Sequence, residues 1–328
     1  MNAEAPPRMS PLRRGAWVAL LATGVGLFLF YGPFKRDVRN EALRAARAVT
    51  DRNRDAFFAA GGYDEDGYTR KGPAIPGEWL YAHPEAGQTF DAFLGKPPLI
   101  VPPDAPRRTF VIQPLTPLRP HAEAVMEPCR EFTELFFTRP CELAEALEIP
   151  ASTHRADTDQ YDAAALLDWL EARRPEHAVS YTGLCDEDLI VDHLDNFLFG
   201  LGRFSSGLGC YSYARFYHPG VDETLYLKRT LQLLNHEIGH SFGLHHCIYF
   251  SCSMNGANNL PEADRTPLHF CPLCLRKLQR CFGFDVRERY EGLQAFYARQ
   301  GLDDEASWVA ERLAHLERSG RTAPWDEE

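Results

Sequence analysis

The chain has 328 residues, of which 45% are hydrophobic and 25% are charged, and its formal net charge is −11. This length allows one large or two small globular domains, while the acidic balance argues against a protein that lies on nucleic-acid backbones, which needs a basic face. Nine cysteines, an odd number spread over a long chain, do not match a secreted disulfide framework. Metal ligation together with free thiols, in a reducing compartment, is the better interpretation.

Residues 16–32 form an uncharged, mostly apolar run preceded by Arg8, Arg13 and Arg14. The run is near the lower length limit of about 17 residues for a spanning helix, and its basic start resembles that of a signal peptide. Its end has no small-x-small pattern for cleavage, and it has no polar face for a buried core helix. We therefore expect an uncleaved membrane anchor. More basic residues follow the run than precede it, so the positive-inside rule places the C-terminal body in the cytoplasm.

The next elements follow from hydrophobic periodicity and from the glycines and prolines that interrupt it. Helices are expected at residues 34–60, 124–137, 161–174, 228–243, 273–284, 286–300 and 304–320. Strands are expected at 109–115 and 177–184, and a pair of short strands within 196–217. Segments 61–77 and 95–108 are a linker and a loop, and residues 321–328 are expected to be disordered. Strands before and among helices indicate an α+β fold.

The stretch "HEIGH" matches the motif H-E-x-x-H within the helix predicted at 228–243. Residues four apart lie on one helix face, separated by about 6 Å of rise, so His236 and His240 can hold one metal ion from the same side. Glu237 is turned by about 100° around the axis. Its carboxylate therefore lies beside the metal, where it can accept a proton from water.

A third ligand is expected after Gly243, because glycine can adopt positive φ, end the helix and turn the chain. His245 and His246 are both candidates, and the spacing H-E-x-x-H-x-x-G-x-x-H selects His246. Three protein ligands leave the fourth tetrahedral position of a catalytic zinc ion for water. A chance match to the longer motif is rare. With zinc lowering the pKa of its water and Glu237 as general base, the motif predicts hydrolysis of peptide bonds.

Two cysteine pairs follow the histidines, C-x-x-x-x-C at Cys247 and Cys252 and C-x-x-C at Cys271 and Cys274. Both spacings suit one zinc ion with four thiolates, a saturated site with a structural role. The alternatives are four free thiols or two disulfides. The remaining cysteines follow no such pattern and are expected to be small buried hydrophobes: Cys129, Cys141, Cys185, Cys210 and Cys281.

The stretch "HEIGHSFGLHHCIYFSCSM", followed by "CPLC", resembles the archaemetzincin family of the metzincin clan. Three further stretches are also similar to that family: residues 77–95, 196–217 and 258–279. The resemblance covers roughly residues 77–298. Neither the run at 16–32 nor the tail from about residue 300 belongs to it.

The resemblance implies a zincin-like fold with a mixed sheet, an active-site helix and a methionine turn, with zinc at the floor of a cleft. His236, His240 and His246 would bind catalytic zinc, Glu237 would be the general base, and the four paired cysteines would bind a second, structural zinc ion. Met254 would form a hydrophobic base under the metal. Residues 205–217 would include the edge strand that pairs with an extended substrate. Gly256, two residues after Met254, offers no tyrosine for the oxyanion.

These observations predict a membrane-tethered zinc metallopeptidase with two zinc ions. The expected domains are an N-terminal tail and anchor (1–33), a basic helix and linker (34–76), the metalloprotease domain (77–298), and a C-terminal helix with an acidic tail (299–328). The alternative is a zinc-containing peptide-binding or scaffold protein that cleaves nothing. A zinc-ribbon nucleic-acid binder would use the cysteine pairs alone, and the net acidity and the histidine motif argue against it.

Overall fold

The computed structural model describes residues 33–192, 197–204 and 206–326. The predicted membrane segment at 16–32 lies outside these ranges, so the anchor and the cytoplasmic location of the body stay predictions. Within the described ranges, no helix has both the length and the apolar character that crossing a membrane requires. The four domains drawn from the sequence also stay predictions.

The largest element is a mixed six-stranded sheet, which confirms the expected α+β class. Its strands are β1 (Thr109–Thr116), β2 (Cys141–Leu143), β3 (Leu147–Glu148), β6 (Ala178–Cys185), β8 (Gly200–Arg203) and β9 (Leu208–Ser212). The order is β2-β1-β6-β9-β8, with β3 beside the far end of β1. All pairs are parallel except β8 with β9. Every residue of the central strand β6 is buried, which is typical of parallel strands covered on both faces.

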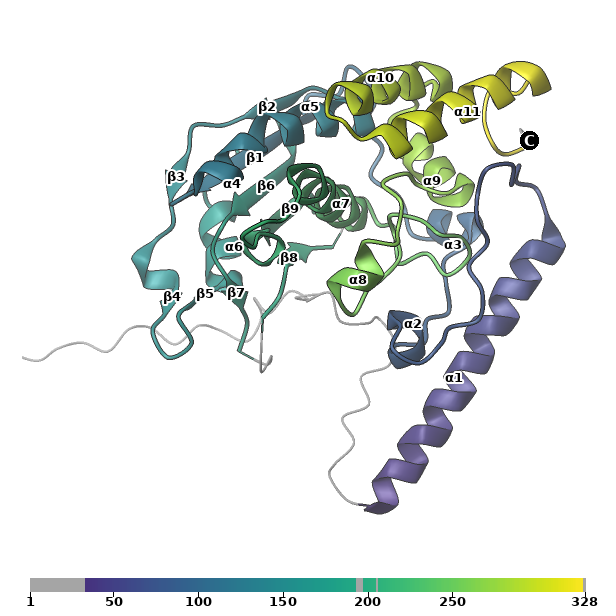
Figure 1. Cartoon of the computed structure of the whole chain (residues 1–328), viewed down its shortest axis with the longest axis horizontal. Helices are drawn as coiled ribbons and strands as arrows, with labels where there is room; N and C mark the ends of the chain where they lie inside the picture. The colour runs from purple at the N-terminus through teal and green to yellow at the C-terminus, as the bar shows by residue number, and fades with distance from the viewer. Residues whose placement is uncertain (1–32, 193–196, 205, 327–328) are drawn as a thin grey trace, which may run out of the picture.

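Side-chain alternation along β1 divides the core between the two faces of this sheet. Phe110 and Ile112 belong to the larger core cluster, together with residues of α5 (Met126–Phe137) and α7 (Glu223–Ser241). Val111 and Leu115 belong to the second cluster, with residues of α6 (Ala163–Glu171). Figure 1 shows α7 alongside the sheet near β9, in the middle of the molecule. The predicted motif helix is therefore part of the core.

The ends of α7 follow from its sequence. Asp222 caps its N-terminus, where the side chain accepts a hydrogen bond from the Leu225 backbone N–H at 3.0 Å, and this satisfies a donor that has no partner inside the helix. The helix ends at Ser241, two residues before Gly243, which has a φ of 87°. The predicted glycine turn is thus confirmed, although the helix begins five residues earlier than expected.

The remaining elements form a small sheet and a helical C-terminal part. The small sheet contains β4 (His154–Arg155), β5 (Gln160–Asp162) and β7 (Leu189–Ile190). The helices of the C-terminal part are α8 (Leu260–Ala263), α9 (Pro272–Phe282), α10 (Val286–Arg299) and α11 (Asp303–Ser319), while the short α4 (Pro120–Ala124) precedes α5. α10 and α11 lie side by side at the top of Figure 1. The sequence predicts helices at the positions of α9, α10 and α11.

The N-terminal part of the described chain contacts the body instead of standing apart from it. It contains α1 (Pro33–Ala60), α2 (Trp79–Ala82) and α3 (Phe90–Leu94). Figure 1 shows α1 along one side of the molecule, close to α2. Its side chains bind backbone carbonyls of α2 and of the segment after it, as in the bonds from Arg47 Nε to Tyr81 O at 2.8 Å and from Thr50 Oγ1 to Glu85 O at 2.7 Å.

Two expectations about chain segments are wrong. Residues 321–326 are ordered, because Trp325 is buried and pairs by its backbone with Tyr63. The edge strand expected within 205–217 also lies elsewhere. Those residues contain β9, which lies between β6 and β8, and the sheet of described strands ends with β8. The reason is topological: β8 turns back antiparallel on the outside of β9.

Candidate active site

Three imidazoles converge at the C-terminal end of α7. His236 and His240 project from the same helix face, as their spacing predicts. After Gly243 the chain turns, and His246 returns toward them. One ring nitrogen from each of these three histidines lies within 4.8 Å of the others. The structure therefore brings together the three predicted ligands and excludes His245, whose ring lies against Phe204 instead.

The second ring nitrogen of each histidine has an acceptor that fixes the tautomer. Nδ1 of His236 lies 2.7 Å from the Ser253 carbonyl oxygen, and Nδ1 of His240 lies 2.6 Å from the Leu244 carbonyl oxygen. Nδ1 of His246 lies 2.7 Å from Oε1 of Glu85. A carbonyl or carboxylate oxygen accepts, so each Nδ1 carries the proton. Every Nε2 is then left with a lone pair for a metal.

The spacing of these lone pairs fits a metal ion. Nε2 of His236 and Nε2 of His240 are 3.0 Å apart, and neither carries a proton that could bond the other. Metal–nitrogen bonds of about 2.1 Å at tetrahedral angles set two ligand nitrogens about 3.4 Å apart. Without a cation, the two Nε2 lone pairs would repel each other; a cation between the rings would accept both lone pairs as ligands. The donor set of three imidazoles suits zinc.

Burial keeps these rings in the form that binds metals. Burial and the neighbouring His246 ring lower the pKa of His236 to about 3. Burial, with the His236 and His246 rings, also lowers the pKa of His240 well below its ordinary value. Both imidazoles are therefore neutral at physiological pH, and neutral imidazole is the ligand form.

Glu237 lies beside the histidine cluster without belonging to it, as the helix geometry predicts. Its side chain is buried and lines a cavity together with His236. Burial raises the pKa of the Glu237 carboxyl to about 8. A cation held by the histidines opposes this shift, because nearby positive charge favours the carboxylate. Glu237 is thus a group whose proton affinity is set by its surroundings, which is typical of a general base.

The cavity beside Glu237 has a volume of about 130 Å³ and a largely apolar lining. Its apolar side chains come from the segments around β8 and β9, from α7 and from the loop around α8: Phe199, Phe216, Leu233, Ala257, Leu260 and Ala263. Arg229 also lines it, but the guanidinium is held by Asp264, with Nε 2.8 Å from Oδ1 and Nη2 2.7 Å from Oδ2. The cavity can therefore hold an apolar side chain next to His236 and Glu237.

Met254 is fully buried against the helix turn between the two α7 histidines. A Cβ atom at Gly239 would lie 2.6 Å from Met254 Sδ, closer than a side chain tolerates. Glycine at 239 thus gives the methionine its place under His236 and His240. The position agrees with the hydrophobic base that the sequence resemblance implied.

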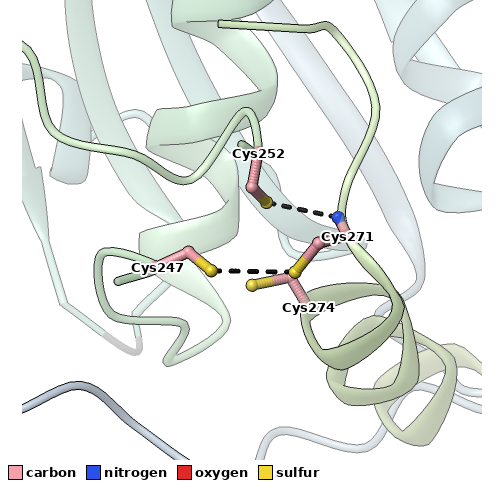
Figure 2. Close-up of side chains that lie close together, drawn as sticks. All are labelled: Cys247, Cys252, Cys271 and Cys274. Atoms are coloured by element: carbon pink, nitrogen blue, oxygen red, sulfur yellow. Dashed lines mark hydrogen bonds between the residues drawn. The ribbon is translucent and has the colours of Figure 1, made fainter. Parts of the chain in front are cut away.

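The four paired cysteines form a second cluster directly behind the first. Their sulfur atoms lie within 4.8 Å of one another, and Figure 2 shows Cys247 and Cys252 facing Cys271 and Cys274. Sγ of Cys247 is 3.7 Å from Sγ of Cys271, too far for a disulfide of about 2.05 Å. Zinc–sulfur bonds of about 2.3 Å at tetrahedral angles set sulfurs about 3.8 Å apart. The cluster therefore fits a four-thiolate zinc ion.

Two backbone N–H groups point at one sulfur of this cluster. The N–H groups of Cys271 and Met254 point at Cys252 Sγ, with N–S distances of 3.3 and 3.5 Å. A zinc-bound cysteine sulfur can accept such bonds, so these two donors fit the position of a ligand. The other five cysteines are buried free thiols away from this cluster, which confirms their predicted role as small hydrophobes: Cys129, Cys141, Cys185, Cys210 and Cys281.

Sequence reasoning missed the residues that hold the site from the N-terminal side. Glu85 bonds His246, and Trp79 Nε1 donates to the same Glu85 oxygen at 2.6 Å. Although burial by itself raises the pKa of Glu85, these hydrogen bonds bring it below the ordinary value. Gln88 binds the turn after α7, through Gly243 O at 3.0 Å and the His245 N–H at 3.1 Å. These residues lie within the family-like stretch 77–95, which carried no assigned role.

The chain is similar to known proteins along most of its length. The profile of peptidase family M54 matches residues 143–280. Archaemetzincin-2 of Pongo abelii is 31% identical over 278 residues, which cover 71% of this chain and 74% of the relative. An archaemetzincin of Methanopyrus kandleri is 39% identical over 133 residues, or 40% of this chain and 74% of that protein.

A solved structure, the archaemetzincin of Methanopyrus kandleri, is 31% identical and covers 54% of this chain and 97% of its own, with a TM-score of 0.49. The family assignment rests on the sequence matches, which extend well beyond the metal-ligand motif and cover about three quarters of the vertebrate relative. The chain belongs to the archaemetzincin family and is a zinc metallopeptidase.

Proposed function

We propose that this metallopeptidase hydrolyses peptide bonds with zinc held by His236, His240 and His246 and with Glu237 as general base. The observation that carries the proposal is the convergence of three unprotonated Nε2 atoms on one point, with a buried carboxylate beside it. When bound, zinc supplies the Lewis acidity that acidifies water and polarises a carbonyl group.

The protein's own groups then move the proton. Glu237 accepts it from the attacking water and delivers it to the leaving amine, so one carboxylate serves both halves of the reaction. Nδ1 of each histidine stays bonded to its acceptor, which keeps the three rings fixed while the substrate changes. Rigid ligands hold the reacting atoms in a near-attack arrangement.

Substrate binding is proposed along β8 and in the cavity next to Glu237. β8 ends the sheet of described strands, and an extended peptide can pair with the backbone of such a strand. Phe199, which directly precedes β8, lines the cavity. A peptide lying along β8 can therefore place one apolar side chain in the cavity and its scissile carbonyl near the histidines.

A second zinc ion on Cys247, Cys252, Cys271 and Cys274 is proposed to be structural. Four protein ligands complete its coordination and leave no position for water. Its role is to fix the loop that carries His246.

Glu237→Gln, which keeps the shape of the side chain but replaces one acceptor oxygen by an NH2 donor and removes the basicity, tests the mechanism. We expect unchanged zinc content and at least ~100-fold slower digestion of a peptide library. Wild-type cleavage should favour peptides with apolar residues and should stop with a chelator. If the wild type cleaves no peptide in a broad library, the catalytically silent peptide-binding protein becomes the better account. Equal digestion by both proteins would contradict the role of Glu237.

A further inference from the structure

Glu85 is the carboxylate partner of the third histidine, although 161 positions separate the two residues. Its Oε1 accepts from His246 Nδ1 at 2.7 Å and from Trp79 Nε1 at 2.6 Å. The Glu85 side chain is only 17% exposed. Solvent therefore screens this contact little, and the two donors fix the position of one carboxylate oxygen.

The backbone around Glu85 is held on both sides. Thr50 on α1 donates from Oγ1 to the Glu85 carbonyl oxygen at 2.7 Å, and Asn53 Nδ2 donates to the Ala86 carbonyl oxygen at 2.8 Å. On the other side, the Trp79 N–H donates to the buried carboxylate of Glu262, with N–O distances of 2.9 and 3.1 Å. These contacts tie the segment after α2 to α1, and α2 itself to α8.

Trp79 is itself fixed against the loop after Met254. A Cβ atom at Gly256 would lie 2.4 Å from Trp79 Cδ1, so the indole packs directly on the glycine backbone. The Trp79 ring also meets His246 edge to face, with centroids 5.3 Å apart. Gly256, which offers no tyrosine, instead makes room for the tryptophan that orients Glu85.

His246 depends on such a partner more than the other two histidines do. His236 and His240 stand on a regular helix and donate to backbone carbonyls. His246 stands in an irregular loop after the helix end, and its Nδ1 acceptor is a side chain with negative charge. A carboxylate partner fixes the tautomer and ring orientation of a ligating histidine and strengthens its donation to the metal.

We infer that Glu85 is a positioning residue of the catalytic metal centre, which acts through His246 and sets the zinc affinity of the histidine site. The inference rests on the proposed ligands His236, His240 and His246, but not on peptide hydrolysis. It assigns to the N-terminal segment a part in building the active site. Glu85 does not touch the reacting atoms, so its removal acts first on metal binding.

The test compares Glu85→Ala and Glu85→Gln with Glu78→Gln in the full-length protein. Glu78 directly precedes α2 and accepts from the Ile75 N–H, so Glu78→Gln makes the same chemical change at a carboxylate that bonds the backbone and not a histidine. Zinc affinity is measured by competition with a chromogenic chelator. The His246→Ala variant identifies the signal of the histidine site, because it should lose that ion alone. Melting temperatures of all variants are measured in parallel.

We expect zinc to bind Glu85→Ala about 10- to 100-fold more weakly than the wild type. Glu85→Gln should lose less, because its amide oxygen can still accept from His246 Nδ1, and Glu78→Gln should match the wild type. Wild-type zinc affinity in Glu85→Ala, with only a lower melting temperature, would overturn the inference and leave Glu85 a packing residue. Should Glu85→Ala not fold, Glu85→Gln decides: the loss of the negative charge should still weaken zinc binding, and an unchanged zinc affinity in Glu85→Gln overturns the inference.

Zinc affinity is read without a substrate, so the two proposals fail separately. A wild-type protein that cleaves no peptide, with zinc affinity lowered by Glu85→Ala, contradicts the proposed function and supports the inference. Normal peptide cleavage by the wild type, with unchanged zinc affinity in Glu85→Ala, supports the proposed function and contradicts the inference about Glu85.

Discussion

His246 and Cys247 are consecutive in the chain, yet their side chains enter two different ligand clusters. The His246 ring lies with His236 and His240, while Cys247 Sγ lies 3.7 Å from Cys271 Sγ. One peptide bond therefore joins the two candidate zinc sites. Any movement of the cysteine cluster moves the backbone of the third histidine.

Hydrogen bonds extend this connection through the loop. The Cys247 N–H donates to the Met254 carbonyl oxygen at 2.8 Å, and Asn255 Nδ2 donates to the Cys247 carbonyl oxygen at 2.8 Å. The Cys252 N–H in turn donates to Asn255 Oδ1 at 3.0 Å. The loop between α7 and α9 has little regular structure besides α8, so these bonds and the cysteine cluster contribute to holding it.

Cys271→Ser should release the structural zinc ion and destabilise the body. Structural zinc contributes folding free energy directly, so we expect one zinc ion fewer per chain and a loss of roughly 3 kcal/mol or more in the free energy of unfolding. The zinc affinity of the histidine site should fall as well. Metal analysis and thermal unfolding measure these effects. Cys141→Ser, a buried cysteine outside the cluster, should keep both ions, and a Cys271→Ser protein with two ions and normal melting would refute the assignment.

Residues that act through local spacing were predictable from the sequence. The four-residue helical repeat and one glycine with positive φ set the positions of His236, His240 and His246. The cysteine pairs also follow a local rule, because each pair contributes two neighbouring ligands. In these cases, the residues that determine the position of each ligand are its near neighbours in the chain.

Contacts between distant segments were not predictable from the same pattern. Glu85 reaches His246 only because α1 and α2 lie against the body, which no periodicity specifies. The edge strand was misplaced because β9 and β8 are both short and glycine-rich, and their order in the sheet depends on how β8 folds back. Trp325 sits in a polar tail that favours disorder, and its ordering depends on pairing with Tyr63.

Gly243→Ala should lower both stability and zinc binding. Gly243 has a φ of 87°, and an alanine in this region costs about 1–2 kcal/mol. The strain falls on the turn that delivers His246, so zinc affinity at the histidine site should drop together with the melting temperature. Gly283→Ala is the matched control, because Gly283 has a φ of 64° and open space around its Cα. It should lower the melting temperature similarly and leave zinc binding unchanged; equal zinc loss in both variants would contradict the argument.

Gln88 connects a buried lysine on α9 to the turn after α7. Lys277 is only 2% exposed, and its Nζ donates to the Gln88 backbone oxygen at 2.5 Å and to Gln88 Oε1 at 3.1 Å. The same side chain binds Gly243 O and the His245 N–H. Gln88 thus satisfies a buried charge and two backbone groups at once, and such groups are costly to leave without partners.

Gln88→Ala should therefore cost about 2–4 kcal/mol of unfolding free energy, since it leaves the Lys277 ammonium with one fewer acceptor and opens two backbone groups. Lys277→Met removes the buried charge and keeps the apolar stem. In the double variant, Gln88→Ala should lower the free energy of unfolding less than it does in the wild type, with a coupling energy of about 0.5–3 kcal/mol. Denaturant unfolding of the four proteins measures that coupling. Strictly additive losses of unfolding free energy would show that Gln88 and Lys277 act independently. The contact between these two residues would then not stabilise the turn before His246 against α9.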